Sequence, residues 1–173
     1  MERRTAIGVL AGALTLGVGG WALGTHPTGF DEDEHVTVET LEAPGSTADT
    51  WELPSDRPLV LTFFATWCGS CSRQMGTLTD AERRVGDEVP FLSVTSELVG
   101  RSVSRDDVVE WWRDHDGAWT VGLDDGGELA ERFDVAGLPT VAVVDEVGDV
   151  TWSTAGTLDA DRIVDEARSV ASR

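Results

Sequence analysis

The feature that most constrains the fold of this chain is an apolar run that leads directly into a pair of cysteines. Residues 59–64, Leu-Val-Leu-Thr-Phe-Phe, fit a β-strand that is buried on both faces. The segment Trp67-Cys68-Gly69-Ser70-Cys71 follows almost at once. A helix is predicted over residues 68–85, because apolar side chains recur there with helical periodicity at Met75, Leu78, Ala81 and Val85. The sequence therefore predicts a buried strand, a CxxC motif and a helix in direct succession.

Cys68 and Cys71 are the only two cysteines in the chain. At a strand-to-helix junction the first thiol lies over the unpaired N–H groups of the helix, where the positive end of the helix dipole favours the nucleophilic thiolate. The second thiol, one turn further on, can close a disulfide. Such a pair suits redox exchange, in which a thiolate attacks a substrate disulfide and its neighbour resolves the mixed disulfide.

Two other uses of the cysteine pair are less well supported. A structural staple gains little, because stabilisation by a disulfide grows with loop length and only two residues separate these cysteines. A zinc site needs about four ligands. His26, His35 and His115 lie neither near a second CxxC nor in HxxxH spacing. Redox chemistry is therefore the favoured interpretation, with no metal and no cofactor expected.

The charge of the chain is unusual. There are 32 acidic residues against 13 basic ones, the formal net charge is −19, and every basic residue is arginine. This balance argues against nucleic acid as a partner. A hydrophobic content of 40% and seven tryptophans favour a folded domain with an acidic surface over a disordered chain. An acidic surface with arginine in place of lysine resembles proteins of extreme halophiles, which work in molar salt.

From this charge we predict that the folded domain is less stable at low salt. In molar salt the Debye length shrinks to about 3 Å, whereas in dilute buffer the carboxylates repel one another over longer distances. The melting temperature should therefore be lower in dilute buffer than in molar salt. Thermal melting under both conditions checks this, and an unchanged midpoint would remove the halophilic interpretation.

Residues 1–24 form a separate block, in which Arg3 and Arg4 precede a run of uncharged residues over 5–24. This run is long enough to span a bilayer, with the arginines inside and the acidic remainder outside. It exceeds the 7–15-residue core of an ordinary signal peptide, which favours a retained membrane anchor. The alternative is a signal peptide cleaved near Ala22-Leu23-Gly24. Either way, the CxxC domain faces outward, and a lipidated N-terminus is not supported.

Residues 25–35 are predicted to be an acidic linker, because Pro, Gly and clustered acids offer no apolar face to bury. The folded domain is predicted over residues 36–173. Its expected strands are 36–38, 50–53, 59–64, 91–95, 119–123, 140–144 and 150–153, and its further helices are 106–114 (capped by Ser104), 128–133 and 159–171. A βαβ unit followed by a hairpin and a last helix implies an α/β fold with a mixed sheet between helices.

A strand, Trp-Cys-x-x-Cys and a helix, followed later by Gly137-Leu138-Pro139-Thr140 before another strand, resemble the thioredoxin superfamily over residues 36–171. The apolar N-terminal run, the leading strands and the phrase Phe64-Ala-Thr-Trp-Cys-Gly-Ser-Cys71 are most similar to the TlpA/ResA group. That resemblance implies a thioredoxin-like fold and a membrane-anchored, extracytoplasmic thiol-disulfide oxidoreductase that acts more as a reductase than as an oxidant.

The resemblance also assigns roles to residues. Cys68 would be the attacking thiolate and Cys71 the buried resolving thiol. Pro139 would follow a cis peptide bond that turns the backbone of Leu138 toward the sulfurs, where a substrate segment can pair with it in β fashion. The same proline would discourage metal capture by the thiols. Trp67, beside the CxxC, is expected to line the site and shield the sulfurs.

One departure from the family concerns proton transfer. Thioredoxins carry a buried Asp six residues before the first cysteine, and this chain has Thr62 there. A hydroxyl cannot replace an acid near neutral pH. Glu97, just beyond the next predicted strand, is the candidate replacement, and the alternative is one more surface carboxylate. Arg73 could stabilise a thiolate, but a solvated position is favoured.

The resemblance further implies partners. These are protein thiols and disulfides, including those of apocytochromes or other exported proteins, and a membrane thiol carrier that supplies electrons. Two other functions stay open. A copper-handling module usually spaces its cysteines as CxxxC and adds a distant His, and a thiol peroxidase needs Thr and Arg around its reactive cysteine.

Overall fold

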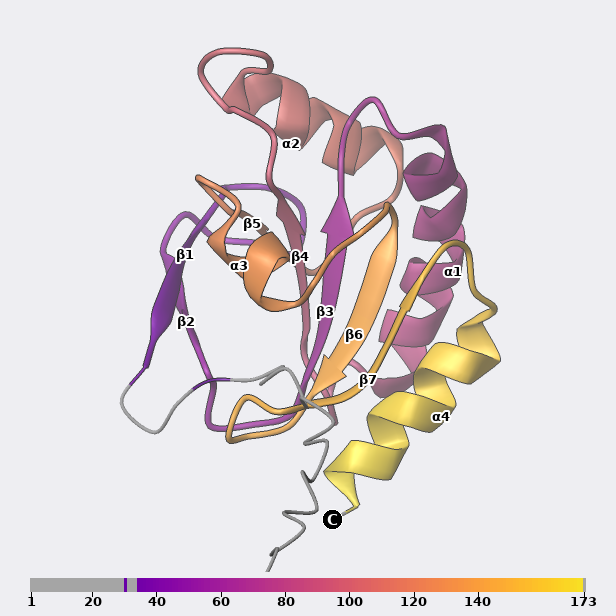
Figure 1. Cartoon of the computed structure of the whole chain (residues 1–173). Helices are drawn as coiled ribbons and strands as arrows, with labels where there is room; N and C mark the ends of the chain where they lie inside the picture. Colours follow the sequence, from indigo (N-terminus) through magenta and orange to yellow (C-terminus); the bar gives the residue numbers. More distant parts are fainter. Residues whose placement is uncertain (1–29, 31–33, 173) are drawn as a thin grey trace, which may run out of the picture.

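The computed structural model describes residues 30 and 34–172 (Figure 1). The predicted anchor over 1–24 and most of the predicted linker lie outside these residues. No helix within the described part is both long and apolar enough to cross a membrane. The elements are β1 (Val36–Thr40), β2 (Thr50–Leu53), β3 (Leu59–Phe64), α1 (Gly69–Val85), β4 (Phe91–Thr95), α2 (Arg105–Asp114), β5 (Thr120–Leu123), α3 (Glu128–Arg132), β6 (Thr140–Val144), β7 (Val150–Ala155) and α4 (Ala160–Ala171).

The strands form one mixed sheet in the order β2-β1-β5-β4-β3-β6-β7. The three central strands β5, β4 and β3 are parallel, because each connection between them contains a helix that returns the chain to the end of the sheet where the previous strand began. The hairpin β6–β7 is antiparallel and pairs with β3, and β1 pairs antiparallel with β5. The predicted mixed sheet and hairpin are therefore confirmed, and β3 lies well inside the sheet with all six residues buried.

Helices cover both faces of the sheet, as predicted (Figure 1). Alternate residues of β3 point to opposite faces, so that Val60 and Phe64 enter one core and Leu61 and Phe63 the other. The first core is completed by α1, α2 and α4, and the second by α3. The helix residues predicted to face inward on α1 and α4 are buried: Met75, Leu78, Ala81, Val85, Ile163, Val164, Ala167 and Val170.

Helix α2 begins at Arg105, one residue earlier than predicted, and Ser104 is its cap residue as predicted. Its hydroxyl accepts a hydrogen bond from the N–H of Asp107 at 3.1 Å, and the Asp107 carboxylate accepts one from the N–H of Ser104 at 2.9 Å. These contacts satisfy two N–H groups that the helix itself leaves free. The hydrogen bond from the Ser104 side chain, followed by that from its backbone, holds the pKa of Asp107 below its ordinary value.

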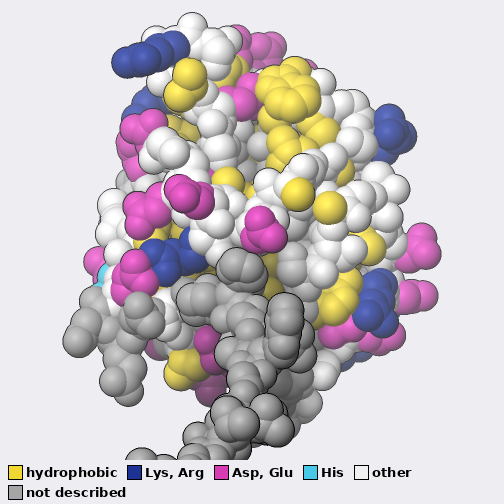
Figure 2. Space-filling model, in the orientation of Figure 1, with side chains coloured by type: hydrophobic (Ala, Val, Ile, Leu, Met, Phe, Trp, Pro, Cys, Tyr) yellow, Lys and Arg dark blue, Asp and Glu magenta, His cyan; other side chains and the backbone are white. Residues whose placement is uncertain are grey.

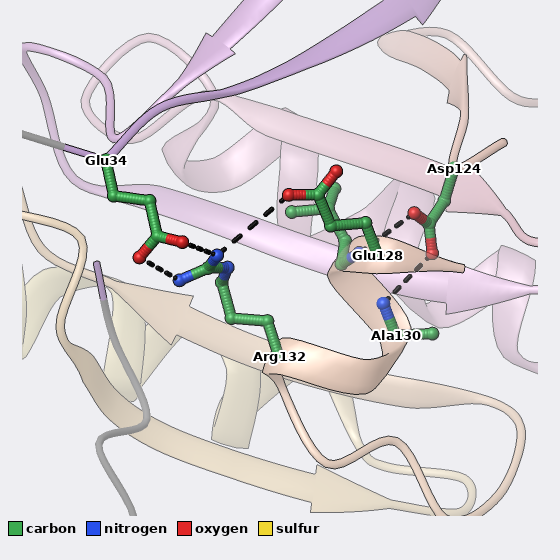
Figure 3. Close-up of polar contacts among 6 residues, drawn as sticks. Glu34, Asp124, Glu128, Ala130 and Arg132 are labelled. Atoms are coloured by element: carbon green, nitrogen blue, oxygen red, sulfur yellow. Dashed lines mark hydrogen bonds and ion pairs between the residues drawn. The ribbon is translucent and has the colours of Figure 1, made fainter. Parts of the chain in front are cut away.

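The part of the predicted linker that the structure describes is packed against α3, unlike the expected solvated tether. The rings of Phe30 and Phe133 meet edge to face, with centroids 6.3 Å apart, and the Arg132 guanidinium lies over the Phe30 ring. The Glu34 carboxylate pairs with Arg132, which also approaches Glu128 (Figure 3). Composition averaged over eleven residues conceals this, because a single aromatic ring is enough to make the contact.

Candidate functional site

The site is built where the chain leaves β3 and enters α1. Cys68 and Cys71 form a disulfide there, with their Cα atoms 5.2 Å apart. Cys68 is the cap residue of α1, and its Sγ accepts a hydrogen bond from the N–H of Cys71 at 3.1 Å. Helix α1 thus starts one residue later than predicted, at Gly69. The first sulfur lies at the unpaired N–H groups of the helix, the arrangement that favours a thiolate.

Both cysteines are nearly covered, with 5% of Cys68 and 2% of Cys71 exposed. Trp67, immediately before them, has 75% of its surface exposed. Among the described residues, no group of three or more His, Cys, Asp or Glu side chains is arranged to hold a metal ion. His35 is exposed, and the ring of His115 stacks on that of Trp111. The two cysteines are therefore largely covered, and Trp67 is an exposed side chain beside them.

The loop before β6 lies against the disulfide. The Leu138–Pro139 bond is cis, as the resemblance implies. The Ser70 hydroxyl donates a hydrogen bond to the Leu138 carbonyl at 3.2 Å, and the hydroxyl oxygen of Ser70 also lies 3.2 Å from Cys68 Sγ. This contact links α1 to the segment in front of β6. A second cis bond, Leu53–Pro54, lies at the end of β2 and was not predicted.

A groove of about 450 Å³ opens next to the CxxC segment, between Trp67, which precedes Cys68, and Leu138, which precedes the cis-proline. Its walls include Trp67, Leu98, Ala136 and Leu138, together with the single carboxylate Glu97. Trp67 lines this groove, and its role in substrate binding and in shielding the sulfurs stays a prediction. Figure 2 shows apolar side chains gathered on this face, near the carboxyl end of β3 in the orientation of Figure 1. An exposed apolar groove beside a reactive group fits a protein segment better than a small polar ligand.

Glu97 lies at the edge of this groove and is tied to the segment that carries the cysteines. Its carboxylate accepts hydrogen bonds from the N–H of Thr66 at 2.7 Å, from the Thr66 hydroxyl at 2.9 Å and from the Thr95 hydroxyl at 3.1 Å. Glu97, the carboxylate that the sequence analysis proposed for the site, therefore contacts Thr66, which lies two residues before Cys68 in the chain.

The family's buried acid is replaced by a pair of hydroxyl groups. Thr62 is buried in β3, and its hydroxyl shares a hydrogen bond with that of Ser93 on β4. The Ser93 hydroxyl also accepts from the indole N–H of Trp119 at 2.9 Å. These polar groups satisfy one another inside the core. They hold no ionisable proton near neutral pH, which leaves Glu97 as the carboxylate of the groove.

Sequence reasoning missed Gln74, which is 1% exposed on α1. Its side-chain amide accepts from the N–H of Leu158 at 2.7 Å and donates to the carbonyl of Leu158 at 3.4 Å, which fixes the loop before α4 to the helix of the cysteines. A polar residue on the apolar side of a predicted helix was the available signal. Arg73 is exposed, and its guanidinium donates to the Gly69 carbonyl of its own helix, as the solvated alternative predicts.

Comparison with known proteins gives a consistent group of relatives. The Redoxin family model matches residues 32–170. The thiol:disulfide interchange protein DsbE of Yersinia pestis is 29% identical over 127 residues, covering 73% of this chain and 63% of that protein. A thioredoxin-like protein of Haemophilus influenzae is 27% identical over 114 residues. The chain spans 63% of the length of each of these two relatives.

A solved structure with the same fold is the exposed lipoprotein thioredoxin Etrx1 of Streptococcus pneumoniae. It has a TM-score of 0.62 and 25% identity, over 75% of this chain and 98% of that one. StoA of Bacillus subtilis superposes with a TM-score of 0.64 at 18% identity, over 77% and 96% of the two chains, and supports the fold alone. The thioredoxin-like fold implied by the motifs is thereby confirmed.

Proposed function

The chain belongs to the Redoxin family, and on that premise we propose that it is a thiol-disulfide oxidoreductase that exchanges disulfides with other proteins through Cys68 and Cys71. The observation that carries this proposal is the disulfide at the start of α1, whose first sulfur accepts a hydrogen bond from the N–H of Cys71 and whose neighbour Trp67 lines an apolar groove. The printed activity of the Yersinia pestis relative, thiol:disulfide interchange, supports it.

In the reductive direction the reaction starts from the dithiol form. The Cys68 thiolate attacks one sulfur of a substrate disulfide, which forms a mixed disulfide and releases the other substrate sulfur as a thiolate that takes up a proton. Cys71 then loses its proton and attacks the Cys68 sulfur. This step forms the Cys68–Cys71 bond, breaks the mixed disulfide and releases the second substrate thiol. The substrate gains two electrons and two protons, and the enzyme ends in the disulfide form.

We place this exchange on the outer face of the membrane, with residues 1–24 as the anchor and 25–35 as the linker to the folded domain. Exported proteins with free cysteines, apocytochromes among them, are the proposed substrates, and a membrane thiol carrier is the proposed donor of electrons. The name of the Streptococcus pneumoniae relative, an exposed lipoprotein, supports an extracytoplasmic site. The acidic surface with arginine but no lysine supports a halophilic source.

Insulin reduction tests the proposed activity. With dithiothreitol as electron donor, the wild-type protein should accelerate the precipitation of insulin B chain well above the rate with dithiothreitol alone. Equilibration with glutathione then gives the reduction potential of the cysteine pair. This potential ranges from about −270 to −120 mV among thioredoxin-like pairs, and a value toward the negative end supports a reductase. Tight stoichiometric copper binding without turnover would contradict the proposal and favour a metal-handling module.

For Glu97 we propose proton transfer to and from Cys71. Replacing it with glutamine keeps the size of the side chain and removes the acid. General acid–base groups contribute about 10²–10⁴-fold to rates, so we expect E97Q to slow resolution of the mixed disulfide by at least tenfold and to change its pH dependence. Asp125, an exposed carboxylate that lines a neighbouring pocket together with Glu97, provides the matched control D125N.

The pH profile of thiol reactivity separates this role from a structural one. Glu97 holds Thr66, and a variant that only loosens that contact would lower rates equally at every pH. A titration curve of E97Q identical to that of the wild type would retire the proton-transfer role.

A further inference from the structure

Ser70 is the residue that contacts both halves of the site. It lies between the two cysteines in the first turn of α1 and is partly buried. Its hydroxyl oxygen lies 3.2 Å from Cys68 Sγ and 3.2 Å from the carbonyl oxygen of Leu138. The reactive sulfur and the backbone before the cis-proline are therefore bridged by one hydroxyl group.

A serine hydroxyl carries a single proton to donate. In the disulfide form the competing acceptors are a carbonyl oxygen and a weakly accepting, uncharged sulfur, so the proton goes to Leu138. After reduction the sulfur of Cys68 becomes a thiolate. A hydrogen bond to a charged acceptor is about twice as strong as a neutral one, so the proton then goes to the sulfur. The same hydroxyl cannot serve both acceptors at full strength.

The neighbouring carbonyls of this loop have donors that reduction does not touch. The Gly137 carbonyl accepts from the Thr140 hydroxyl at 2.7 Å, and the Pro139 carbonyl accepts from the N–H of Gly156 at 2.8 Å. The donor to the Leu138 carbonyl differs, because it comes from the helix of the cysteines. Of these three consecutive carbonyls, Leu138 is the one whose hydrogen-bond donor also contacts the sulfur of Cys68.

We propose that Ser70 is a redox-dependent hydrogen-bond donor that couples the charge of Cys68 to the availability of the Leu138 carbonyl. In the disulfide form Ser70 occupies that carbonyl. In the dithiol form it turns to the thiolate, and the carbonyl is left to accept a backbone N–H of the substrate. The reduced enzyme thus presents an open acceptor to an incoming disulfide, and the oxidised enzyme withdraws it as the product leaves. This inference rests on the proposed function.

Thiol alkylation tests the contact with sulfur. The rate at which iodoacetamide modifies Cys68 in the reduced protein is measured across pH, in wild type, S70A, S70T and S72A. Loss of a hydrogen bond to a charged group should move the S70A profile to higher pH and slow alkylation about tenfold below its midpoint. Ser70→Thr keeps a hydroxyl and should restore the wild-type profile. Ser72, whose side chain takes no part in the contacts above, provides the matched control.

Carbonyl NMR tests the contact with Leu138. Leu-Pro occurs at Leu53–Pro54 and Leu138–Pro139 in the sequence, so labelling leucine carbonyl carbons with ¹³C and proline nitrogens with ¹⁵N gives two coupled signals. On reduction the Leu138 signal should shift in the direction of a lost hydrogen bond, and the Leu53 signal, on β2, should stay in place. In S70A the Leu138 signal should already lie at the reduced position before reduction.

Failure of the Ser70 inference and failure of the proposed function give different results. If wild type reduces insulin but S70A keeps the wild-type alkylation profile, or its Leu138 carbonyl shifts on reduction as in wild type, the coupling is wrong and the oxidoreductase stands. If wild type itself fails to reduce insulin, the proposed function is wrong. A shifted profile together with a loss of the redox response at Leu138 in S70A supports the inference.

Discussion

Replacing Cys68 with serine should lower the rate of insulin reduction to the uncatalysed rate, whereas replacing Cys71 with serine should leave a protein that captures its substrate covalently. Under the proposed function Cys68 should form the first bond to substrate, because its sulfur lies at the start of α1 and accepts a hydrogen bond from the N–H of Cys71. A serine hydroxyl there stays protonated and does not attack a disulfide. The expected C68S protein therefore binds no substrate through sulfur.

In the C71S protein the first step still occurs and the second does not. Well-oriented intramolecular groups reach effective molarities of about 10⁵–10⁸ M, so loss of Cys71 leaves only slow resolution by external thiols. A mixed disulfide between Cys68 and insulin should accumulate and be visible by mass spectrometry without reducing agent. Ser72→Ala, in the same turn, should turn over like wild type. Failure of C71S to accumulate a mixed disulfide, or an adduct trapped on Cys71 in C68S, would contradict the assigned order.

Replacing Trp112 with alanine should cost about 3–5 kcal/mol of unfolding free energy, the range for buried Trp or Phe to Ala changes. Trp112 is completely buried on α2, and its ring lies 4.8 Å from that of Trp119 and 5.9 Å from that of Phe64, measured between centroids. Its indole N–H donates to the Pro44 carbonyl at 3.1 Å. The substitution therefore leaves a cavity and an unpaired carbonyl together.

Urea denaturation measures this loss, and Trp152→Ala provides the matched control. Trp152, on β7, is only partly buried and lies 5.4 Å below the Arg162 guanidinium, so its removal should cost much less. The ring of Trp112 packs against Phe64, which ends β3 four residues before Cys68. Because this packing supports the segment that carries the cysteines, the W112A protein should keep its redox activity only to the extent that it remains folded. Equal losses in the two variants would show that Trp112 does not organise this core.

The strands and helices were predictable because their signals are local. The continuous apolar run of β3 indicated a strand buried on both faces, and helical periodicity identified the inward residues of α1 and α4. Ser104 marked the start of α2 because a capping residue acts within three positions of itself. The cysteine pair was recognisable for the same reason, since its spacing is three residues.

What could not be predicted depends on contacts between distant parts of the chain. Ser70 meets Leu138 across 68 positions, Thr66 meets Glu97 across 31, and Gln74 meets Leu158 across 84. Single polar residues carry no periodic signal, so their partners emerge only once the sheet brings the segments together. Phe30 shows the same limit, because one ring packs against Phe133 from within a stretch whose composition indicates a solvated linker.

Under the proposed function, Cys68 and Cys71 together pass two electrons to a protein disulfide. A single-turnover reaction tests it most directly, in which the fully reduced protein, freed of dithiothreitol, is mixed with excess insulin and both products are counted by mass spectrometry. One Cys68–Cys71 disulfide should form for each insulin disulfide opened, with no reaction in C68S. Insulin that stays oxidised while Cys68 and Cys71 remain dithiols would contradict it.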